Sequence, residues 1–273
     1  MRSRLLLSLA LPLLLLSCKT NKVTGRSQAH LFSESQMNQM GVQAYAEMTG
    51  PAQAKLLTDP RYLAPLQEVG AAISAAANKP DYKWEFRLID DPKTVNAWCL
   101  PGGKIAFYTA IYPVLDDTNG MAIVMGHEVM HAILEHGNER MSQSAISNMV
   151  LEVGSVALSN NKYHDEIIGL MGAGATVGVL LPFSRKQESE ADKWGLYLAA
   201  QAGYDPEAAI QVWERMLKLA GGNAPPKWLS THPPTQERID NMKAWMPKAK
   251  EYYAKSQKKA NRKLAIPPGV GAK

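Results

Sequence analysis

The sequence has few cysteines, few aromatic residues and no long apolar run. It has two cysteines among 273 residues, Cys18 and Cys99, which excludes a disulfide-rich scaffold. Aromatic residues make up 7% of the chain, and no apolar run reaches the about 20 residues that a membrane-spanning helix needs. The composition, 46% hydrophobic and 20% charged, is nevertheless that of a chain with an ordinary buried core. Global disorder is therefore excluded.

The positive charge is concentrated at the C-terminal end. The net charge is +5, and from Lys248 onward Glu251 is the only acidic residue among many lysines and arginines. We expect residues 248–273 to form a solvated basic tail, with contact to anionic lipid as the alternative. Because the basic excess belongs to this tail and no aromatic stacking platform accompanies it, we expect no nucleic-acid partner.

Residues 1–17 are typical of an export signal. Arg2 and Arg4 precede the apolar run 5–16, which is too short to span a membrane as a helix. The run ends in a serine followed by Cys18, which resembles a bacterial lipobox. The resemblance implies a lipidated Cys18 that anchors the chain to a membrane. The alternative is an ordinary secretory signal with an incidental cysteine.

The residues after Cys18 give two further expectations. Residues 18–33 are polar, and we expect them to be a lipidated tether. Lys19 stands where an aspartate would suggest retention in the inner membrane. By resemblance to the sorting rules of enteric bacteria, this predicts an outer-membrane lipoprotein that faces the periplasm.

Residues 34–247 read as one mostly helical domain. Alternating apolar and charged residues predict a strand at 83–89, and 104–109 is a second strand candidate because it follows a tight-turn signal at 101–103. The other periodic segments have helical spacing. The uncharged run 167–181 is interpreted as a core helix, with a membrane span as the alternative. These patterns predict an α+β fold. The expected helices are 34–48, 60–77, 119–138, 142–160, 167–181, 185–202, 206–220 and 235–245.

The predicted helix 119–138 contains an HExxH motif, His127-Glu128-Val129-Met130-His131. Two histidines four residues apart project from one helical face and can together bind one zinc ion. Glu128 lies beside that site and can act as general base towards a metal-activated water. The alternative is a structural histidine pair. We expect one Zn²⁺ per chain.

A catalytic zinc site needs a third protein ligand. His136 lies five residues beyond His131 and points about 140° away on a continuous helix, so it cannot share the metal. Glu188 and Asp192 lie four residues apart on a later predicted helix. Glu188 would complete the ligand set, and Asp192 would accept the free ring N–H of a zinc-bound histidine. Glu190 is expected to face elsewhere, and the alternative is an acidic solvated helix face.

An HExxH motif followed by the ExEAD sequence at 188–192 resembles the gluzincin peptidases of the HtpX, LoiP and BepA type, relatives of the CAAX prenyl protease. The resemblance covers about residues 59–245. Residues 96–105 are similar to the NAxxxPGGxI segment of that family, which forms a sheet edge beside the active-site cleft, where an extended substrate adds as a strand. The resemblance implies a zincin-like domain in which substrate is bound by Asn96, Ala97, Pro101, Gly102 and Gly103.

A late segment, Thr231-His232-Pro233-Pro234 with Arg238, resembles the THPxxxxRI segment of the same family. The resemblance implies that His232 comes close to the zinc, where it stabilises the developing oxyanion or occupies the open position in a resting state. It also places Arg238 among the substrate-binding residues. A histidine before two prolines is otherwise a turn residue. Cys99 lies at a position where the family varies, so no catalytic role is assigned to it.

The leading interpretation is a single-domain zinc endopeptidase of the bacterial cell envelope that hydrolyses misfolded or unassembled envelope proteins. Its zinc would be held by His127, His131 and Glu188. A chaperone or assembly factor with a rarely used zinc site is the alternative, because it needs the same cleft and edge strand. A 2-His-1-carboxylate iron oxygenase fits the ligand types but does not explain Glu128. The sequence does not determine the oligomeric state.

Overall fold

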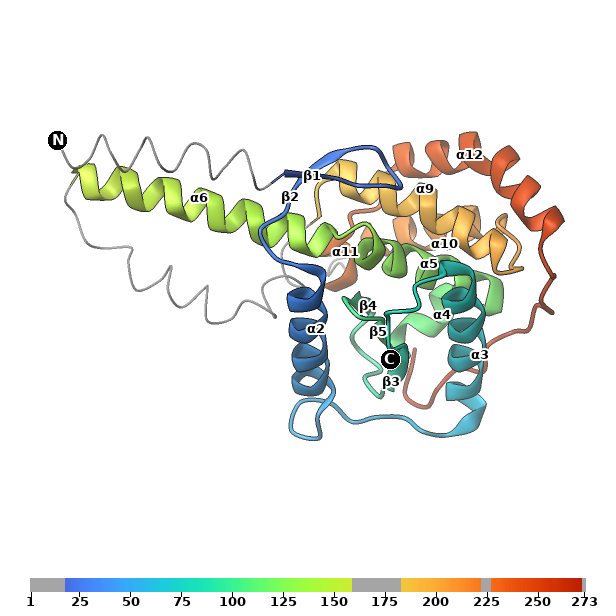
Figure 1. Cartoon of the computed structure of the whole chain (residues 1–273). Coiled ribbons are helices and arrows are strands. Elements are labelled where there is room, and N and C mark those ends of the chain that lie inside the picture. Colours follow the sequence, from blue (N-terminus) through green and yellow to red (C-terminus); the bar gives the residue numbers. More distant parts are fainter. Residues whose placement is uncertain (1–17, 159–182, 222–226, 272–273) are drawn as a thin grey trace.

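The computed structural model describes residues 18–158, 183–221 and 227–271, and in these ranges a small three-stranded sheet is surrounded by helices (Figure 1). Its strands are β3 (Glu85–Ile89), β4 (Ala97–Leu100) and β5 (Lys104–Tyr108), in the order β3-β5-β4. β3 and β5 are parallel, and β4 and β5 are antiparallel. β4 is therefore an edge strand of the described sheet, and the predicted mostly helical α+β fold is confirmed.

The turn between β4 and β5 requires glycine. Gly102 and Gly103 have φ angles of 81° and 79°, a region that L-amino acids with a side chain rarely adopt. The Gly103 N–H donates a 3.2 Å hydrogen bond to the Leu100 carbonyl oxygen, which closes the turn. The two glycines thus hold β4 antiparallel to β5 and fix the position of the edge.

Several of the helices begin at polar caps that the sequence provides. Ser33 and Ser184 each form a capping box with a glutamine three residues later, and the Asp117 side chain accepts a hydrogen bond from the Gly120 N–H. The described helices of four residues or more are α2 (Glu34–Thr49), α3 (Pro60–Ala77), α4 (Tyr112–Leu115), α5 (Thr118–Ile133), α6 (His136–Leu158), α9 (Arg185–Gln201), α10 (Ala208–Ala220), α11 (Lys227–Thr231) and α12 (Gln236–Lys255).

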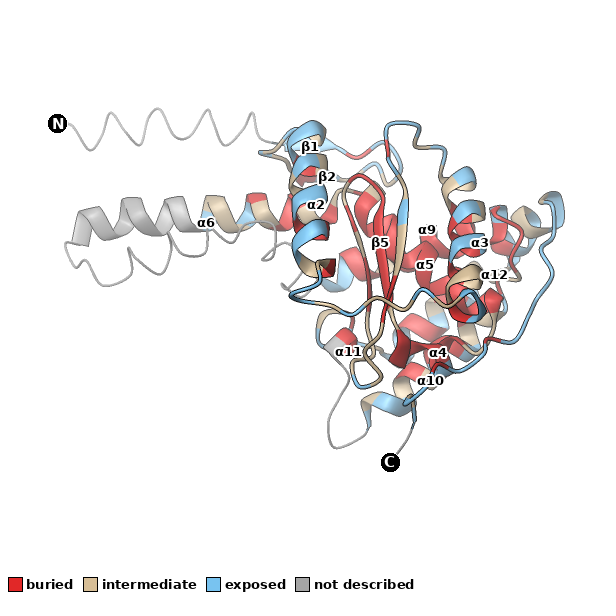
Figure 2. Cartoon of the chain, turned by 90° about the horizontal axis from the view of Figure 1, so that it is seen from below, coloured by how far each residue is buried: buried red, intermediate tan, exposed pale blue. Residues whose placement is uncertain are grey.

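Helix α5, which carries the HExxH motif, is the centre of the hydrophobic core. Every residue from Thr118 to Ala132 is buried, and burial is also dense along α9 and β5 (Figure 2). A helix that is apolar on nearly every face must be covered on all sides, and α3, α9, α10 and β4 provide that cover. The motif therefore lies on a helix that is buried along almost its whole length.

Helices α5 and α9 approach closely through glycines. A Cβ atom on Gly195 would lie 2.7 Å from the backbone nitrogen of His127 and 2.8 Å from the carbonyl carbon of Gly126. Both are backbone atoms, so neither can move away without shifting a helix. This contact sets the distance between the two helices that carry the predicted metal ligands.

We expect Gly195→Ala to destabilise the protein by about 1–3 kcal/mol, because the added methyl group overpacks a contact between two backbones. The measurement is the denaturant midpoint of unfolding. Gly137→Ala on α6 is the control: a Cβ there meets only a flexible methionine at 4.0 Å, so stability should be unchanged or slightly raised. Equal effects of the two substitutions would contradict the proposed close approach.

The predicted single helix 119–138 is wrong in one respect. Helix α5 ends at Ile133, and α6 begins at His136, after only two intervening residues. Between them Glu135 has a φ angle of 58°, a left-handed conformation that breaks the helix and changes its direction. The predicted helix 142–160 corresponds to α6, and the predicted core helix 167–181 lies outside the described residues.

Residues 18–33, expected as a tether, instead pack on the domain. The strands β1 (Cys18–Thr20) and β2 (Ser27–Ala29) form an antiparallel hairpin that lies beside α6 and α9 (Figure 1). The buried side chains of Asn21 and Gln28 both donate hydrogen bonds to the Leu134 carbonyl oxygen, at 3.2 and 3.0 Å. We call residues 18–33 the N-terminal strap. Asn21 and Gln28 thus satisfy the end of α5 rather than face solvent, whereas Lys19, Thr20 and Lys22 are exposed.

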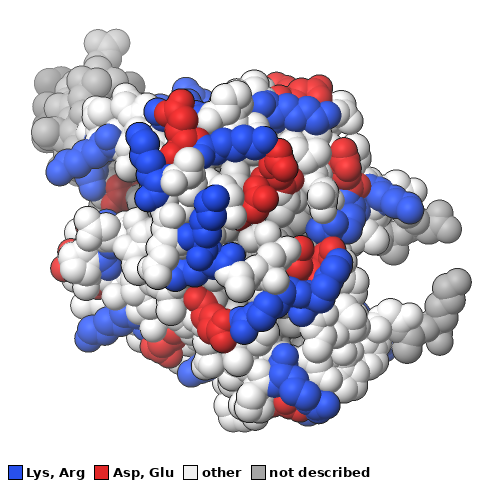
Figure 3. All heavy atoms as spheres, turned by 90° about the vertical axis from the view of Figure 1, so that its right-hand side faces the viewer, with Lys and Arg blue, Asp and Glu red and all other residues white. Residues whose placement is uncertain are grey.

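The basic C-terminal region also differs from a free tail. Its first part completes α12, and Leu264 is buried, with its N–H donating to the Asp116 carbonyl oxygen at 3.0 Å. Lys263 pairs with Asp116, and Arg262 pairs with Glu68. On the face shown in Figure 3, basic and acidic side chains are interspersed. Acidic partners on the domain therefore hold the segment that composition alone indicated as solvated.

Among the described residues, no helix is both long enough and apolar enough to cross a membrane.

Candidate active site

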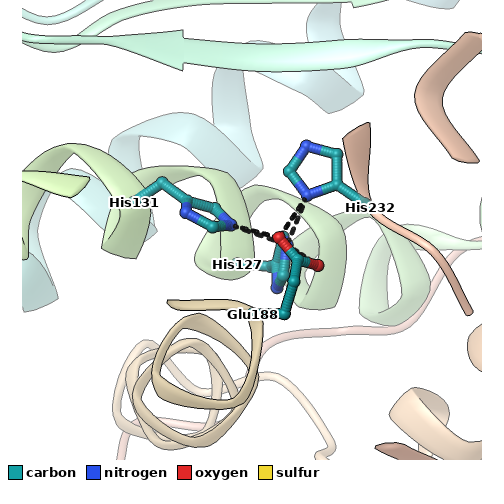
Figure 4. Close-up of side chains that lie close together, drawn as sticks. All are labelled: His127, His131, Glu188 and His232. Carbon is teal, nitrogen blue, oxygen red and sulfur yellow. Dashed lines mark hydrogen bonds and ion pairs between the residues drawn. The ribbon is translucent and has the colours of Figure 1, made fainter. Parts of the chain in front are cut away.

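Four side chains from three parts of the chain meet at one buried point. His127 and His131 come from α5, Glu188 from the first turn of α9, and His232 from the segment after α11 (Figure 4). One nitrogen or oxygen atom of each lies within 4.8 Å of the others, and each residue is 3% exposed or less. The His131 Nε2 atom lies 3.1 Å from His127 Nε2 and 3.3 Å from Glu188 Oε1. The structure thus brings together the three predicted metal ligands.

This donor set fits zinc. Two imidazole nitrogens and one carboxylate oxygen are the ligands of a catalytic zinc site, which also keeps one position for water or substrate. Both histidines direct Nε2 to the common point, so a single ion can contact both. The two histidines and the glutamate lie on two helices that pack against each other, α5 and α9. His127, His131 and Glu188 would hold the zinc.

The ionisation of His131 and Glu188 also suits a metal site. Burial lowers the pKa of His131 well below its usual value, which keeps the imidazole neutral with a free lone pair. Burial opposes ionisation of Glu188, but the nearby His232 and Arg238 outweigh it and hold the pKa of this carboxyl well below its usual range. A neutral imidazole and an ionised carboxylate are the forms that bind zinc.

Glu128 lies beside the cluster without being part of it. Its Oε1 atom accepts a 2.8 Å hydrogen bond from the indole N–H of Trp228 and lies 3.7 Å from His232 Nε2. Glu128 is buried, and its carboxylate faces the same cleft as His131. The geometry suits a general base next to the metal. No sequence pattern had pointed to Trp228, which lies 100 residues further along the chain.

Asp192 and Arg238 support the ligands from behind. Asp192 Oδ1 lies 3.0 Å from His127 Nδ1, the ring nitrogen opposite the metal-facing one. Arg238 donates two hydrogen bonds of 2.7 Å to the Asp192 carboxylate, and its Nη1 lies 2.7 Å from Glu188 Oε2. Arg238 was predicted to bind substrate, whereas here its guanidinium contacts two carboxylates of the site. Its position makes it a support for Glu188 and Asp192.

A cleft runs from His131 and His232 along the edge of the sheet. It is lined by Asn96, Ala97 and Pro101 on the side of β4, by helix α2, and by Glu128, His131 and His232. The predicted residues Gly102 and Gly103 form the turn behind it and are not among its described lining. Cys99 lines the cleft, but burial raises the pKa of its thiol well above the usual value. The thiol is therefore a poor metal ligand at neutral pH.

The structure adds residues that the sequence patterns did not indicate. Phe183 stacks on the His131 ring with centroids 3.7 Å apart, and the Arg140 guanidinium lies 3.5 Å from the Phe183 ring centroid. His136, excluded as a ligand, lies 2.9 Å from His131 through their Nδ1 atoms. It comes this close because the chain turns at Glu135, so the angle expected of a continuous helix does not apply.

Comparisons with known proteins agree with this geometry. The sequence profile described as Peptidase family M48 matches residues 60–246. Mitochondrial metalloendopeptidase OMA1 of Schizosaccharomyces pombe is 40% identical over 181 residues, covering 65% of this chain and 51% of that protein. OMA1 of Saccharomyces cerevisiae is 36% identical over 186 residues (64% and 50%). The beta-barrel assembly-enhancing protease of Escherichia coli is 28% identical over 221 residues (79% and 45%).

The chain spans about half the length of these relatives. They contradict one prediction, that of an outer-membrane lipoprotein facing the periplasm, because the relatives with 36–40% identity are mitochondrial proteins. That prediction depended on a short apolar run and two residues after it, a pattern that several kinds of targeting segment share. Lipidation of Cys18, which is exposed in β1, stays a prediction.

The expected HtpX, LoiP and BepA type is matched only in part, since the protease of Escherichia coli is a more distant relative than the two OMA1 proteins. The family itself is not in doubt. Its profile covers most of the chain, including β4, the HExxH helix, α9 and the segment with His232. The chain belongs to peptidase family M48, and in the structure His127, His131, Glu188 and His232 form one buried cluster that could hold a metal ion.

Proposed function

We propose that this protein is a zinc-dependent endopeptidase that cleaves extended segments of unfolded or unassembled proteins. The observation that carries the proposal is the position of Glu128 and of His131, a member of the metal-binding cluster, at the wall of a cleft that follows the edge strand β4. A relative of this chain is named a metalloendopeptidase, and another an assembly-enhancing protease. Both names agree with a peptide-bond hydrolase that acts on protein chains.

The edge of β4 offers backbone groups to an extended peptide. The Tyr108 N–H donates a 3.1 Å hydrogen bond to the Asn96 carbonyl oxygen, so alternate residues of the strand, beginning with Asn96, direct their backbone groups towards β5. By the same alternation, the N–H and C=O groups of Ala97 and Cys99 face the free edge. A peptide that adds there as a strand is bound through hydrogen bonds to its backbone. Such binding requires an unfolded segment and is tolerant of sequence.

The chemistry follows from the groups around the cluster. When bound, zinc polarises the scissile carbonyl and lowers the pKa of a coordinated water to about 7. Glu128 accepts the proton of the attacking water on its carboxylate and then delivers it to the leaving nitrogen. The Trp228 N–H fixes the orientation of that carboxylate, and Asp192 with Arg238 fixes the His127 ring. His232 Nε2 lies on the cleft side, where an oxyanion would develop.

A second function, a chaperone or assembly factor with a latent site, is favoured by the position of His232. Its Nδ1 atom lies 2.9 Å from Glu188 Oε1 and 3.2 Å from His127 Nε2, inside the ligand cluster itself. In that place it would fill the position that water or substrate needs. The site would then be closed at rest and would open only when His232 moves away.

The test is cleavage of casein, an unfolded protein, by residues 18–273 with one bound zinc. We expect cleavage that is lost after removal of zinc with a chelator and returns when zinc is added back. A folded protein of similar size should be cut far more slowly, because it offers no free strand. Cleavage that survives chelation would contradict the proposal. A zinc-loaded protein that binds casein but does not cut it would favour the latent site.

A further inference from the structure

The zinc ligand His131 has a second ring nitrogen whose partner is unusual. Its Nε2 atom faces the ligand cluster, and its Nδ1 atom lies 2.9 Å from Nδ1 of His136, which is fully buried. An Nε2 atom that binds a metal carries no hydrogen, so the hydrogen of the neutral ring is on Nδ1. His131 therefore donates, and the His136 Nδ1 atom must accept. This fixes the hydrogen of His136 on its Nε2 atom.

That hydrogen has an acceptor in the right place. His136 Nε2 lies 3.0 Å from Oε2 of Glu190, the acidic residue that was expected to face away from the site. Glu190 is in turn held by Arg26, whose Nε and Nη2 atoms donate hydrogen bonds of 2.7 and 2.9 Å to its two oxygens. The chain of contacts runs His131, His136, Glu190, Arg26, and we call it the His131 relay.

The contacts in the His131 relay resemble those that position His127, the other proposed metal-binding histidine. His127 faces Asp192, and Arg238 donates two hydrogen bonds to that carboxylate. Each metal-facing imidazole is thus linked to a carboxylate, and an arginine binds that carboxylate through two nitrogen atoms. A carboxylate in this place orients the ring and raises its basicity as a ligand. The difference is that His131 reaches its carboxylate through a second imidazole.

We propose that His136, Glu190 and Arg26 are positioning residues for the zinc ligand His131, and that the N-terminal strap is thereby a working part of the metal site. Arg26 lies in the strap, before residues 60–246 that match the family profile. The proposal rests on the zinc site of the proposed function. Zinc affinity is measured without substrate, so failure to cleave casein would leave it standing.

The competing explanation is that these groups only fasten the strap to the domain. Arg26 also donates to Glu139, which accepts hydrogen bonds from Gln28 and Gln187 at 3.2 and 2.8 Å. Glu139 and Glu190 are thus both partners of Arg26, but only Glu190 contacts His136. Substituting Glu190 and Glu139 one at a time therefore distinguishes a role in positioning His131 from a role in attaching the strap to the domain.

The first experiment compares Glu190→Gln with Glu139→Gln. Zinc dissociation constants are measured on the metal-free proteins by competition with a chelator, and thermal unfolding of the same samples reports folding. Glu190→Gln is expected to weaken zinc binding by about 10-fold, the lower end of the range for partners of metal-bound histidines. Glu139→Gln should leave the constant close to that of the parent, because of the two carboxylates only Glu190 contacts His136. Equal weakening by both would overturn the proposal.

The second experiment tests the relay at its centre. His136→Leu removes both contacts and is expected to weaken zinc binding by about 10–100-fold and to change the visible absorption spectrum of the Co²⁺-substituted protein. His136→Gln should recover most of the affinity and the spectrum, because its amide can accept from His131 and donate to Glu190. Unchanged affinity in folded His136→Leu, or no rescue by glutamine, would overturn the proposal.

The third experiment tests the strap. Arg26→Ala is expected to weaken zinc binding as His136→Leu does, whereas Lys19→Ala, which removes another ion pair between the strap and the domain, should not. Lys19 Nζ pairs with Glu135 at 3.2 Å and has no contact with the relay. Zinc affinity in folded Arg26→Ala equal to that of the parent would show that the strap does not serve the metal site, and would overturn this part of the proposal.

Discussion

Replacing Glu128 with glutamine is expected to lower kcat for casein cleavage by about 10²–10⁴-fold, the usual contribution of a general acid–base. Glutamine keeps the size of the side chain and can still accept the hydrogen bond from Trp228, so the cleft should be unchanged. It cannot accept the proton of the attacking water. Bound zinc should stay at one per chain, because Glu128 is not in the ligand cluster. Cleavage rates and zinc content are measured on the same preparations.

Two controls make this result specific. Glu214→Gln on the exposed face of α10 should cleave casein at the rate of the parent. Trp228→Phe removes the N–H that orients the Glu128 carboxylate, and we expect an intermediate loss of about 10-fold, the scale of one charge-assisted hydrogen bond. If Glu128→Gln cleaves as fast as the parent, the activity comes from another site or another protein, and the proposed mechanism is wrong.

Replacing Glu188 with glutamine is expected to weaken zinc binding by more than about 100-fold, beyond the range for residues that only support a ligand. The amide has no negative charge to offer the metal, and cleavage should be lost together with the zinc. Glu188 also lies 2.7 Å from Arg238, but Arg238 keeps its two hydrogen bonds to Asp192. The protein should therefore fold, and the chelator competition can be performed on folded material.

His232→Ala separates the roles of the two residues that complete the cluster. His232 contacts Glu188 and His127 but also moves, in the proposed mechanism, out of the position that substrate needs. Its loss should change zinc affinity by no more than about 10-fold, the lower range for a supporting residue. If Glu188→Gln retains zinc as the parent does while His232→Ala loses it, His232 is the third ligand, and the assignment of Glu188 is wrong.

Local patterns were sufficient for much of the site. The spacing of His127 and His131 and that of Glu188 and Asp192 each place two side chains on one helical face, and the structure brings the two faces together. Helical periodicity depends only on neighbours in the sequence, so it can be read without knowing the fold. The position of β4 at the sheet edge came from a family resemblance, not from periodicity.

The same reasoning failed where one residue broke the pattern. A continuous helix through 138 places His136 away from His131, and nothing in the sequence announces that Glu135 adopts a left-handed conformation. Residues other than glycine, asparagine and aspartate rarely adopt this backbone conformation. We therefore attribute the conformation of Glu135 to packing around the end of α5. The contacts of Glu190 were missed because its partners, His136 and Arg26, are not on its own helix and helical spacing says nothing about them.

The sequence alone predicted the chemistry, namely a zinc-binding histidine pair, a general base and a third ligand, and it predicted the mostly helical domain that the structure shows. Tertiary structure decided how these groups are supported. Arg26 lies 164 residues from Glu190, and Lys263 lies 147 residues from Asp116, yet these contacts turn an expected tether and an expected tail into parts of the domain. From composition alone, polar and charged segments are predicted to be solvated, because composition does not show which residues they contact in the folded protein. The partners are distant in sequence and meet only once the core has packed.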